Sequence, residues 1–485
     1  KGFVEMKRNH AIYMGFYRKS QSILQGLELL FKCLFLIIGF LQACSLTFGN
    51  IIISVFQWPM IFLGAVLLLY RLIYFPKYLK TRGIILLILF AISYFISMLV
   101  NYQYGGLHEN TRYLMFMVFQ FGLLYAFDVE RDPEINRKQM LFVSKLYLCG
   151  AAVLSLASFC FMAIGYSKQF VPSEGPVYYI GFNYGRLFGA YWDPNIAATI
   201  ACLAVFLSIY FFITEKQLFH RIVYVLSVLL QISYITFSDS RTGKLCLIVG
   251  SFFFFLFLFV KHRFFLGKIK QIACVVVLLF VISSLAYFVP KAIKQGYNYV
   301  QNKIVTMSSD SDECVEKKKE EQIGREQDIS SDPSNRRFDI WKSAIELFEA
   351  SPIVGVSRAN TLRFAEANLP DTYIINNDHM KFDSLHNLFF EILASQGILG
   401  IIFFVLFAVW TLWGIIKNAK YLWESSHYKL FALIICIMAI VCASTLVMAE
   451  IVYVTSPISL MFWLGLGCLN HYIGNNHMLQ NTEGK

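Results

Sequence analysis

Long apolar runs without charge are the feature that most constrains this chain. Residues Leu245–Val260 read LCLIVGSFFFFLFLFV, and Ile401–Trp413 is a second run that contains no charged side chain. A helix needs roughly 20 apolar residues to cross about 30 Å of bilayer hydrocarbon, and runs of this kind are typical of such helices. The composition agrees, since 57% of the residues are hydrophobic and only 15% are charged. We therefore expect an all-α polytopic membrane protein.

Hydropathy along the chain predicts about twelve transmembrane helices. Their expected ranges are 28–48, 51–70, 83–101, 112–127, 140–165, 195–214, 221–237, 243–260, 270–289, 387–416, 428–449 and 452–470. These ranges divide the chain into five parts. The parts are a cytoplasmic N-terminal segment (1–27), helices one to nine (28–289), a large extracytoplasmic loop (290–386), helices ten to twelve (387–473) and a cytoplasmic tail (474–485).

Lysine and arginine are concentrated in alternate short loops. One set of loops carries Lys7, Arg8, Arg18, Lys19, Arg71, Lys77, Lys80, Arg82, Arg131, Arg137, Lys138, Lys216, Arg221, Lys261, Arg263, Lys268, Lys270, Lys417, Lys420 and Lys429. The other short loops hold Arg112, Lys168, Arg186 and Arg241. Basic residues in short loops stay on the cytoplasmic side, so we expect both termini there. This bias also explains the net charge of +11 without nucleic-acid binding, because the sequence has no compact basic domain.

The large loop, residues 290–386, has two different parts. Its middle is rich in charge and poor in apolar residues, which predicts that 306–335 is flexible. The stretch RRFDIWKSAIELFEASPIVGV follows it, with a proline near its end and apolar residues at helical spacing, namely Ile340, Trp341, Ala344, Ile345 and Phe348. We expect this stretch to form a small amphipathic helical subdomain on the outer face.

The sequence lacks the motifs of several common kinds of catalytic site. It contains no HExxH, no phosphate-cradling glycine loop and no pair of catalytic carboxylates. The 11 cysteines have no CxxC or other metal-ligand spacing, and most fall inside expected spans, where they read as small apolar side chains. We therefore expect neither a metal site nor a cofactor.

Three arginines stand out because the outer segments are otherwise poor in isolated cations. Arg186 lies in GFNYGRLFGAYWDPN, Arg241 in FSDSRTG and Arg337 in SNRRFDIW. A charged residue at a membrane boundary costs free energy, and arginine binds phosphate through paired, charge-assisted hydrogen bonds. Arginines grouped at the outer leaflet would suit a lipid-linked pyrophosphate. The alternative is that each one extends toward water or pairs with a nearby aspartate.

His386 begins the helix expected after the large loop, in DSLHNLFFEILASQGILG. An unperturbed imidazole has a pKa of about 6.5, so it can accept or donate a proton near neutrality. Asp383 or Glu391 could orient the ring, and nearby cations would lower its pKa and keep it neutral, as a base requires. The alternative is an interfacial histidine that caps the helix. Glu450, between the last two spans, either faces the same site or is an ordinary interfacial carboxylate.

Four blocks resemble the bacterial O-antigen ligase and O-antigen polymerase superfamily. In chain order they are GRLFGAYWDPNIAA from Gly185, SDSRTGKL from Ser238, RRFDIWKSAIELFEASPIVGV from Arg336 and HNLFFEILASQGILG from His386. They extend over about the second half of the chain, whereas the N-terminal spans are similar only in hydropathy. The resemblance implies a metal-independent, GT-C-like membrane glycosyltransferase. Such enzymes take glycan from undecaprenyl pyrophosphate on the outer face of the bacterial cytoplasmic (inner) membrane.

The resemblance also implies roles for the candidate residues. Arg186 and Arg241, with Arg337, would bind the pyrophosphate and stabilise its charge as it leaves. His386 would accept the proton of an acceptor hydroxyl, with inversion at the sugar. The residues implied to support the site are Asp383, Asn387, Trp341 and Asn195. Asp193 departs from the family, which more often has a neutral polar residue before the Pro-Asn pair, and pairing with Arg186 would compete with phosphate binding.

Three functions remain open. A polymerase would transfer the glycan to the acceptor sugar of the next lipid-linked repeat unit, building an O-antigen of lipopolysaccharide or a capsule. The Phe-, Ile- and Tyr-rich composition and the lysine-rich loop favour it, with a chain-length regulator as the expected partner. A ligase would transfer finished glycan to lipid A core or a protein. A flippase or transporter of lipid-linked oligosaccharide is the third, although paired Gly/Pro-broken helices in matching halves are missing from the sequence.

Overall fold

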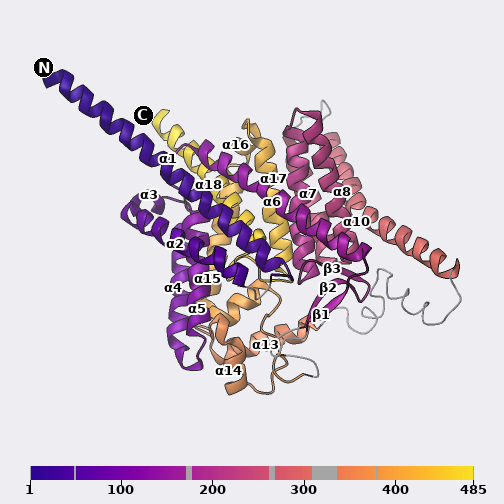
Figure 1. Cartoon of the computed structure of the whole chain (residues 1–485). Coiled ribbons are helices and arrows are strands. Elements are labelled where there is room, and N and C mark those ends of the chain that lie inside the picture. Colours follow the sequence, from indigo (N-terminus) through magenta and orange to yellow (C-terminus); the bar gives the residue numbers. More distant parts are fainter. Residues whose placement is uncertain are drawn as a thin grey trace.

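The structure is a computed structural model of the chain, and it describes residues 2–47, 51–170, 177–261, 268–307, 336–377 and 381–483. Helices dominate the fold (Figure 1). In chain order the α-helices are α1 (Gly2–Ala43), α2 (Ile51–Ile73), α3 (Phe75–Leu79), α4 (Ile84–Val100), α5 (Leu107–Phe119), α6 (Pro133–Ala163), α7 (Pro194–Thr214), α8 (Leu218–Phe237), α9 (Arg241–Lys261), α10 (Lys268–Met307), α13 (Arg337–Ala350), α14 (Thr361–Asn368), α15 (Leu388–Lys417), α16 (Ala419–Glu424), α17 (Tyr428–Thr445) and α18 (Pro457–Glu483). The other elements are the short helices η1 (Tyr102–Tyr104), η2 (Gln120–Tyr125, a π-helix) and η3 (Arg358–Asn360) and the strands β1 (Lys168–Phe170), β2 (Tyr178–Asn183) and β3 (Arg186–Gly189).

Many of these helices have the length and composition of membrane spans. Within the described residues, 8 helices are long and apolar enough to cross a bilayer, and they fall in α1, α2, α6, α7, α8, α9, α15 and α17. α4 is a shorter apolar helix of the same kind. The expectation of an all-α polytopic membrane protein is therefore confirmed.

Hydropathy predicted some helix ends closely and missed others. α15 begins at Leu388, one residue from the expected start, because the preceding asparagine caps it. α10 instead continues past residue 289, through Pro290, to Met307, so the expected large loop begins with helix. Proline has no N–H and often ends a helix, but long membrane helices tolerate it. Residues 308–335 lie outside the described residues, so the flexibility expected for 306–335 stays a prediction.

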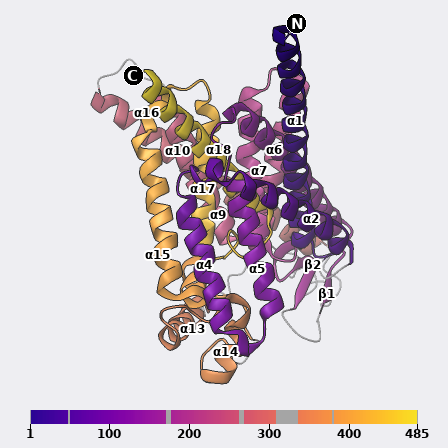
Figure 2. The ribbon, with the colours of Figure 1, turned by 90° about the vertical axis from the view of Figure 1, so that its left-hand side faces the viewer.

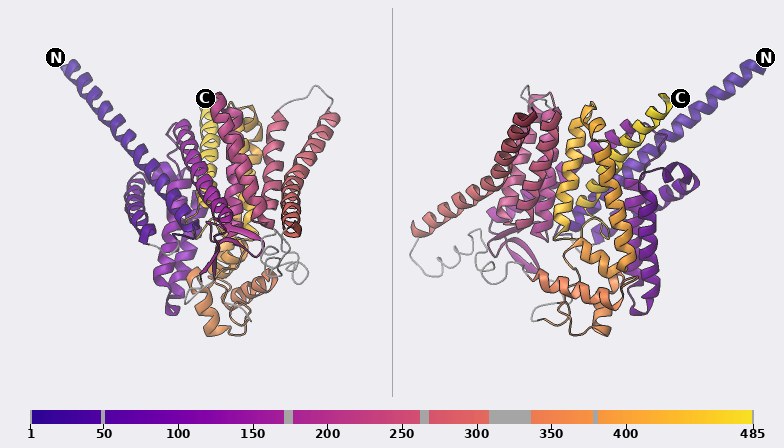
Figure 3. Two further views of the ribbon diagram at one scale, coloured as in Figure 1. Left: turned by 45° about the vertical axis from the view of Figure 1, so that its right-hand side comes forward. Right: turned by 180° about the vertical axis from the view of Figure 1, so that it is seen from behind.

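The two ends of the helical bundle differ in what they carry. Both chain termini lie at one end, whereas α13, α14 and the three strands lie at the other, in every view of the molecule (Figures 1, 2 and 3). We call the second end the loop end. It contains the start of α15 and therefore the segment around His386.

A small antiparallel sheet at the loop end was not part of the helical expectation. Its strands have the order β1–β2–β3. In the β2–β3 hairpin Asn183 pairs with Arg186, so the turn consists of Tyr184 and Gly185. Their φ angles are 51° and 67°, and a type I′ turn requires positive φ at both positions. The turn places Arg186 at the first position of β3.

α7 is the central helix of the bundle. Its sequence PNIAATIACLAVFLSIYFFIT is apolar on all sides, and residues around its whole circumference are buried. It packs against α8, α9 and α17. A helix that is hydrophobic all round belongs in the interior of a bundle. Its N-terminus, next to β3, opens at the loop end.

The amphipathic helix expected in the large loop is α13. Ile340 and Ala344 are buried as expected, together with Leu347, and α13 packs against α15. Ile345 was also expected on the apolar face, but it is 42% exposed. The apolar stripe is therefore narrower than the sequence spacing suggested.

Candidate functional site

Arg186 is held where β3, the start of α7 and the turn after α8 meet. Only 8% of its surface is exposed. Its Nε donates a hydrogen bond to the backbone oxygen of Ser238 at 2.8 Å, and its Nη2 donates one to Oδ1 of Asn195 at 3.2 Å. These two bonds fix the orientation of the guanidinium.

Asp193 and Asn195 form the start of α7. The Oδ1 of Asp193 accepts hydrogen bonds from the backbone nitrogens of Asn195 at 2.6 Å and Ile196 at 3.1 Å, which makes it the N-cap of the helix. Such a cap stabilises a helix by satisfying amide groups that have no partner within it. Asn195 in turn accepts bonds from Arg186 and from the Ser240 hydroxyl, the latter at 2.9 Å. The residue that departs from the family pattern therefore has a capping role.

The turn between α8 and α9 carries more positive than negative charge. Asp239 has a φ of 43°, and its Oδ1 lies 2.7 Å from Nζ of Lys244 and 3.4 Å from Nζ of Lys294. Burial alone would raise the pKa of Asp239, but the hydrogen bonds and charges of the two lysines outweigh it and hold the pKa below its usual range. Arg241 begins α9 and is exposed. Two lysines therefore pair with the carboxylate that lies two residues before Arg241.

His386 stands directly before α15 and does not cap it. The cap is Asn387, whose Oδ1 accepts hydrogen bonds from the backbone nitrogens of Phe389 at 2.8 Å and Phe390 at 3.3 Å. The Nδ2 of Asn387 also donates to the backbone oxygen of Leu446 at 2.9 Å, which joins this segment to the end of α17. The alternative of a histidine that caps the helix is wrong, because a neighbouring asparagine does so.

Charges from several elements act on His386. Burial lowers its pKa, Asp193 raises it and Arg337 lowers it, while Asp383 and Arg358 have smaller opposing effects. The sum is a pKa below the usual range, so the neutral imidazole is favoured at pH 7. These electrostatic contacts bring the start of α7 and the start of α13 to the same histidine.

The arginine and histidine halves of the site meet at the start of α7. Asp193 acts electrostatically on His386, and Asn195 holds Arg186. Asp193 also acts on Glu450, whose pKa is raised to about 7 by burial and by that charge. Glu450 therefore belongs to the same region, one of the two readings that its sequence position left open.

Trp341 contributes by packing. Its ring stacks on Phe390 with centroids 5.3 Å apart and 27° between the planes, and it meets Phe338 edge-on. Its Nε1 is buried without a hydrogen-bond partner among the described residues. The stack joins α13 to the first turn of α15, close to His386, so Trp341 supports this part of the site.

Arg358, in the loop after α13, is a residue that sequence reasoning missed. Its Nε lies 2.6 Å from Oε1 of Glu391, and both side chains are largely buried. The other oxygen of Glu391 accepts a hydrogen bond from a backbone nitrogen. Glu391 is therefore paired with Arg358, which corrects the expectation that it could orient the imidazole directly. A weak signal was present, because VGVSRAN also contains an isolated outer arginine, three residues after a glycine.

The described residues show no arrangement of side chains that could bind a metal ion. Within that part of the chain, no group of three or more His, Cys, Asp or Glu side chains is placed to hold a metal ion. The cysteines described there are free thiols.

A comparison with protein families finds a match across much of this site. Residues 226–405 match the family model described as O-antigen ligase. This segment of the chain is similar to that family. The match confirms the resemblance to the O-antigen ligase and polymerase superfamily, whose members are membrane glycosyltransferase-like enzymes. The matched range includes Arg241, Arg337 and His386, while Arg186 and Asn195 precede it.

A curated protein similar to this chain comes from Haemophilus influenzae. It is an uncharacterized protein, and it is 23% identical over 356 residues. The aligned region covers 72% of this chain and 74% of the relative, so the similarity extends well beyond the matched domain.

Proposed function

We propose that this protein is a polymerase of a surface polysaccharide, of the O-antigen or capsule type. It transfers the glycan of an undecaprenyl pyrophosphate donor to a sugar hydroxyl of a lipid-linked repeat unit. The reaction takes place at the extracytoplasmic face of the bacterial inner membrane. The observation that carries the proposal is that the start of α7 holds Arg186 through Asn195 and acts on His386 through Asp193, at the end of the bundle away from both termini.

The arginines act on the leaving group. Arg186 presents a guanidinium oriented by Ser238 and Asn195, and Arg241 and Arg337 begin α9 and α13. Guanidinium groups bind phosphate oxygens through paired hydrogen bonds and stabilise negative charge that develops in the transition state. The bond between the anomeric carbon and the pyrophosphate oxygen breaks, and its electron pair leaves with undecaprenyl pyrophosphate.

His386 acts on the acceptor. The acceptor oxygen attacks the anomeric carbon from the face opposite the pyrophosphate, so the configuration inverts as the glycosidic bond forms. The neutral imidazole takes the proton that this hydroxyl loses. Because pyrophosphate is a good leaving group, the reaction needs neither an enzyme nucleophile nor a metal ion.

A ligase is the second candidate, because the matching family model is described as O-antigen ligase. The donor and the roles of Arg186 and His386 are the same in both reactions. Only the acceptor differs, since a ligase transfers finished glycan to lipid A core or to a protein.

The test uses purified protein in nanodiscs with undecaprenyl-pyrophosphate-linked repeat unit as its sole substrate, in the presence of EDTA. A polymerase gives a ladder of glycan lengths, and His386→Ala abolishes it. His108→Ala is the matched control, because His108 is an exposed histidine on α5 and its loss should leave the ladder unchanged.

Each other outcome points to a different function. Product that forms only when lipid A core or a protein is added identifies a ligase. Absence of product with every acceptor, together with movement of the lipid-linked unit across the bilayer, identifies a transporter. A full ladder from His386→Ala refutes the assignment of the base.

A further inference from the structure

Arg358 and Glu391 form a buried ion pair beside the segment that carries His386. Arg358 Nε lies 2.6 Å from Glu391 Oε1, with side-chain exposures of 15% and 0%. A buried charge must be paired, and breaking such a pair leaves the remaining charge without compensation. The two side chains are therefore expected to stay paired, which keeps the positions of Arg358 and Glu391 constant relative to each other.

The pair holds the segment before His386 through the backbone of two of its residues. Glu391 Oε2 accepts a hydrogen bond from the Leu385 nitrogen at 3.0 Å, and Arg358 Nη1 donates one to the Asp383 backbone oxygen. His386 follows directly with a φ of 50°, in the left-handed region that residues other than glycine rarely adopt. Such a conformation persists only where the surrounding structure imposes it.

The two residues that follow Arg358 are held by Asn110 of α5 and by Asn101, which directly follows α4. The backbone nitrogen of Ala359 donates to Oδ1 of Asn110 at 3.0 Å. Asn360 Nδ2 donates to the backbone oxygen of Asn101 at 2.9 Å. These bonds join η3, which begins at Arg358, to two helices that are far from it in sequence.

The loop before Arg358 is also locked to α15. Val356 N donates to the backbone oxygen of Ala394 at 2.8 Å, and Ser357 N donates to that of Ser395 at 3.0 Å. A Cβ atom on Gly355 would lie 2.4 Å from the backbone nitrogen of Gln396, so only glycine allows this approach. Arg358 is thus placed relative to the same helix that His386 precedes.

We infer that Arg358, acting through Glu391, is a positioning residue that sets the backbone of residues 383–386 and thereby aims the His386 imidazole at the acceptor hydroxyl. The inference rests on the proposed function of His386 as the base. Because Glu391 neutralises the Arg358 guanidinium within a largely buried pair, Arg358 is a poor candidate for a direct phosphate ligand.

The experiment measures steady-state kinetics of Arg358→Gln, Arg358→Lys and Glu391→Gln in nanodiscs. A catalytic group displaced by about 1 Å costs on the order of 100-fold in rate. We therefore expect Arg358→Gln to lower kcat by about 100-fold and to change the KM for the lipid-linked unit by less than about threefold. Arg358→Lys keeps the charge and should recover part of kcat. Arg363→Gln is the matched control, since its exposed side chain lies 4.0 Å from Glu109 in a surface pair.

Two further measurements separate positioning from a general loss of structure. In the double variant His386→Ala/Arg358→Gln, the second change should have no further effect on the residual rate of a single transfer step, because Arg358 acts through the missing ring. Hydrogen exchange should become faster at residues 383–387 in Arg358→Gln while α7 and α17 stay protected.

The outcomes that overturn the inference differ from those that overturn the proposed function. A raised KM with unchanged kcat makes Arg358 a substrate ligand and refutes positioning. Equal losses from Arg358→Gln with and without His386 also refute it, as does full activity of Arg358→Gln when His386→Ala is inactive. Activity retained by His386→Ala refutes the proposed function itself.

Discussion

The Nη2 of Arg186 lies 3.2 Å from Oδ1 of Asn195. The same oxygen accepts a hydrogen bond from the Ser240 hydroxyl at 2.9 Å, so one amide joins β3, the start of α7 and the turn before α9. The neutral amide therefore orients the guanidinium through a hydrogen bond, the kind of contact that fixes an arginine for phosphate recognition.

Changes at Asn195 test this arrangement. Asn195→Ala removes the bond to Arg186, and a hydrogen bond to a charged group contributes about 1.5–3 kcal/mol. We expect kcat/KM for the lipid-linked unit to fall about tenfold or more. Asn195→Asp places a carboxylate against the guanidinium and should lower kcat/KM further. Initial rates from the glycan ladder measure both, with exposed Asn368→Ala on α14 as the control, and an Asp variant that is faster than the Ala variant contradicts the role of Arg186.

The pH dependence should report the lowered pKa of His386. Burial and the charge of Arg337 depress it, against the opposing charges of Asp193 and Asp383. A base acts when unprotonated, so kcat should be constant from pH 8 down to the usual histidine range of about 6.5 and should fall only below it. The same protonation lowers stability in that acid range, because the unfolded state binds the proton more tightly than the native state.

Arg337→Gln provides the check on this pH profile. Removal of the cation should move the acid limb of kcat to higher pH, because less positive charge then opposes protonation. Arg363→Gln on α14 removes an exposed charge and should leave the limb in place. An acid limb that stays fixed in Arg337→Gln would mean that another group titrates.

The sequence predicts those elements whose signals are local. Apolar length located α15 almost to the residue, and helical spacing located α13. The β2–β3 hairpin was missed because its signal is only the Tyr184–Gly185 turn within a short outer segment. The break in α15 at Gly397 was also missed, because it depends on contact with backbone atoms of the loop at Ile353.

In the candidate site, too, residues with a local sequence signal could be predicted, whereas contacts between residues far apart in the sequence could not. Arg186 could be selected because cations are rare in the short outer loops, and His386 because it directly precedes an apolar helix. The resemblance implied Asn195 as a supporting residue, but its bond to Arg186 and the bond from Arg186 to Ser238 form only in the folded bundle and could not be predicted. Arg358 had a comparable local signal but no distinguishing neighbour, and its pairing with a glutamate 33 positions along the chain is a property of the fold.

Glu450 should make stability depend on pH with a defined sign. Burial and Asp193 raise its pKa from 4.5 to about 7. Between pH 4.5 and about 7 the native state binds more protons than the unfolded state, so the free energy of unfolding falls as the pH rises. Glu450→Gln cannot ionise and should be more stable than the wild type by about 1–3 kcal/mol at pH 8, with little difference at pH 4.5. Thermal unfolding in detergent at both values measures this, and exposed Glu424→Gln on α16 is the control.

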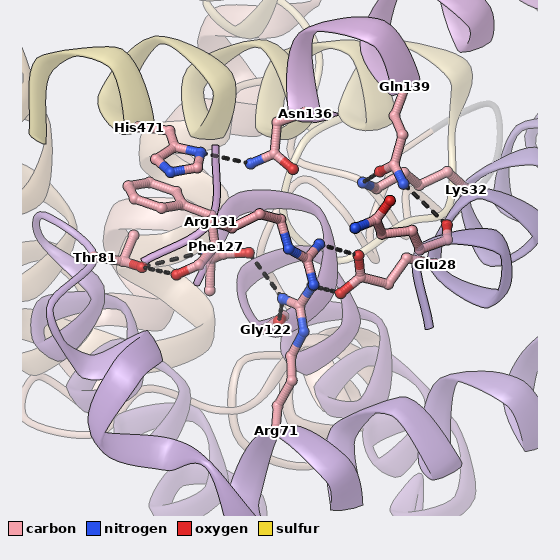
Figure 4. A network of polar contacts seen from close by, with 12 residues as sticks. Glu28, Lys32, Arg71, Thr81, Gly122, Phe127, Arg131, Asn136, Gln139 and His471 are labelled. Atoms are coloured by element: carbon pink, nitrogen blue, oxygen red, sulfur yellow. Dashed lines mark hydrogen bonds and ion pairs between the residues drawn. The ribbon is translucent and has the colours of Figure 1, made fainter. Parts of the chain in front are cut away.

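A second buried charge cluster lies away from the loop end. Figure 4 shows Glu28 of α1 between Arg71 and Arg131, at 2.8 and 2.5 Å. Lys32, one turn along α1, donates to Gln139 of α6 at 2.5 Å. Arg71 and Arg131 read in the sequence as loop cations, but the structure buries both side chains. Arg71 also donates to the backbone oxygens of Gly122 and Ala126, which lie within η2 and directly after it. Arg71 therefore joins Glu28 of α1 to η2.

Removal of that carboxylate should destabilise the fold without altering the chemistry. Glu28→Gln leaves two guanidiniums buried without their counter-ion, which costs about 3–5 kcal/mol. Glu130→Gln is the matched control, because the Lys77–Glu130 pair is exposed and such pairs contribute about 1 kcal/mol or less. We expect the unfolding midpoint to drop strongly only for Glu28→Gln, while kcat per folded molecule stays near the wild-type value. A large loss of kcat in well-folded Glu28→Gln would instead couple this cluster to the site at the loop end.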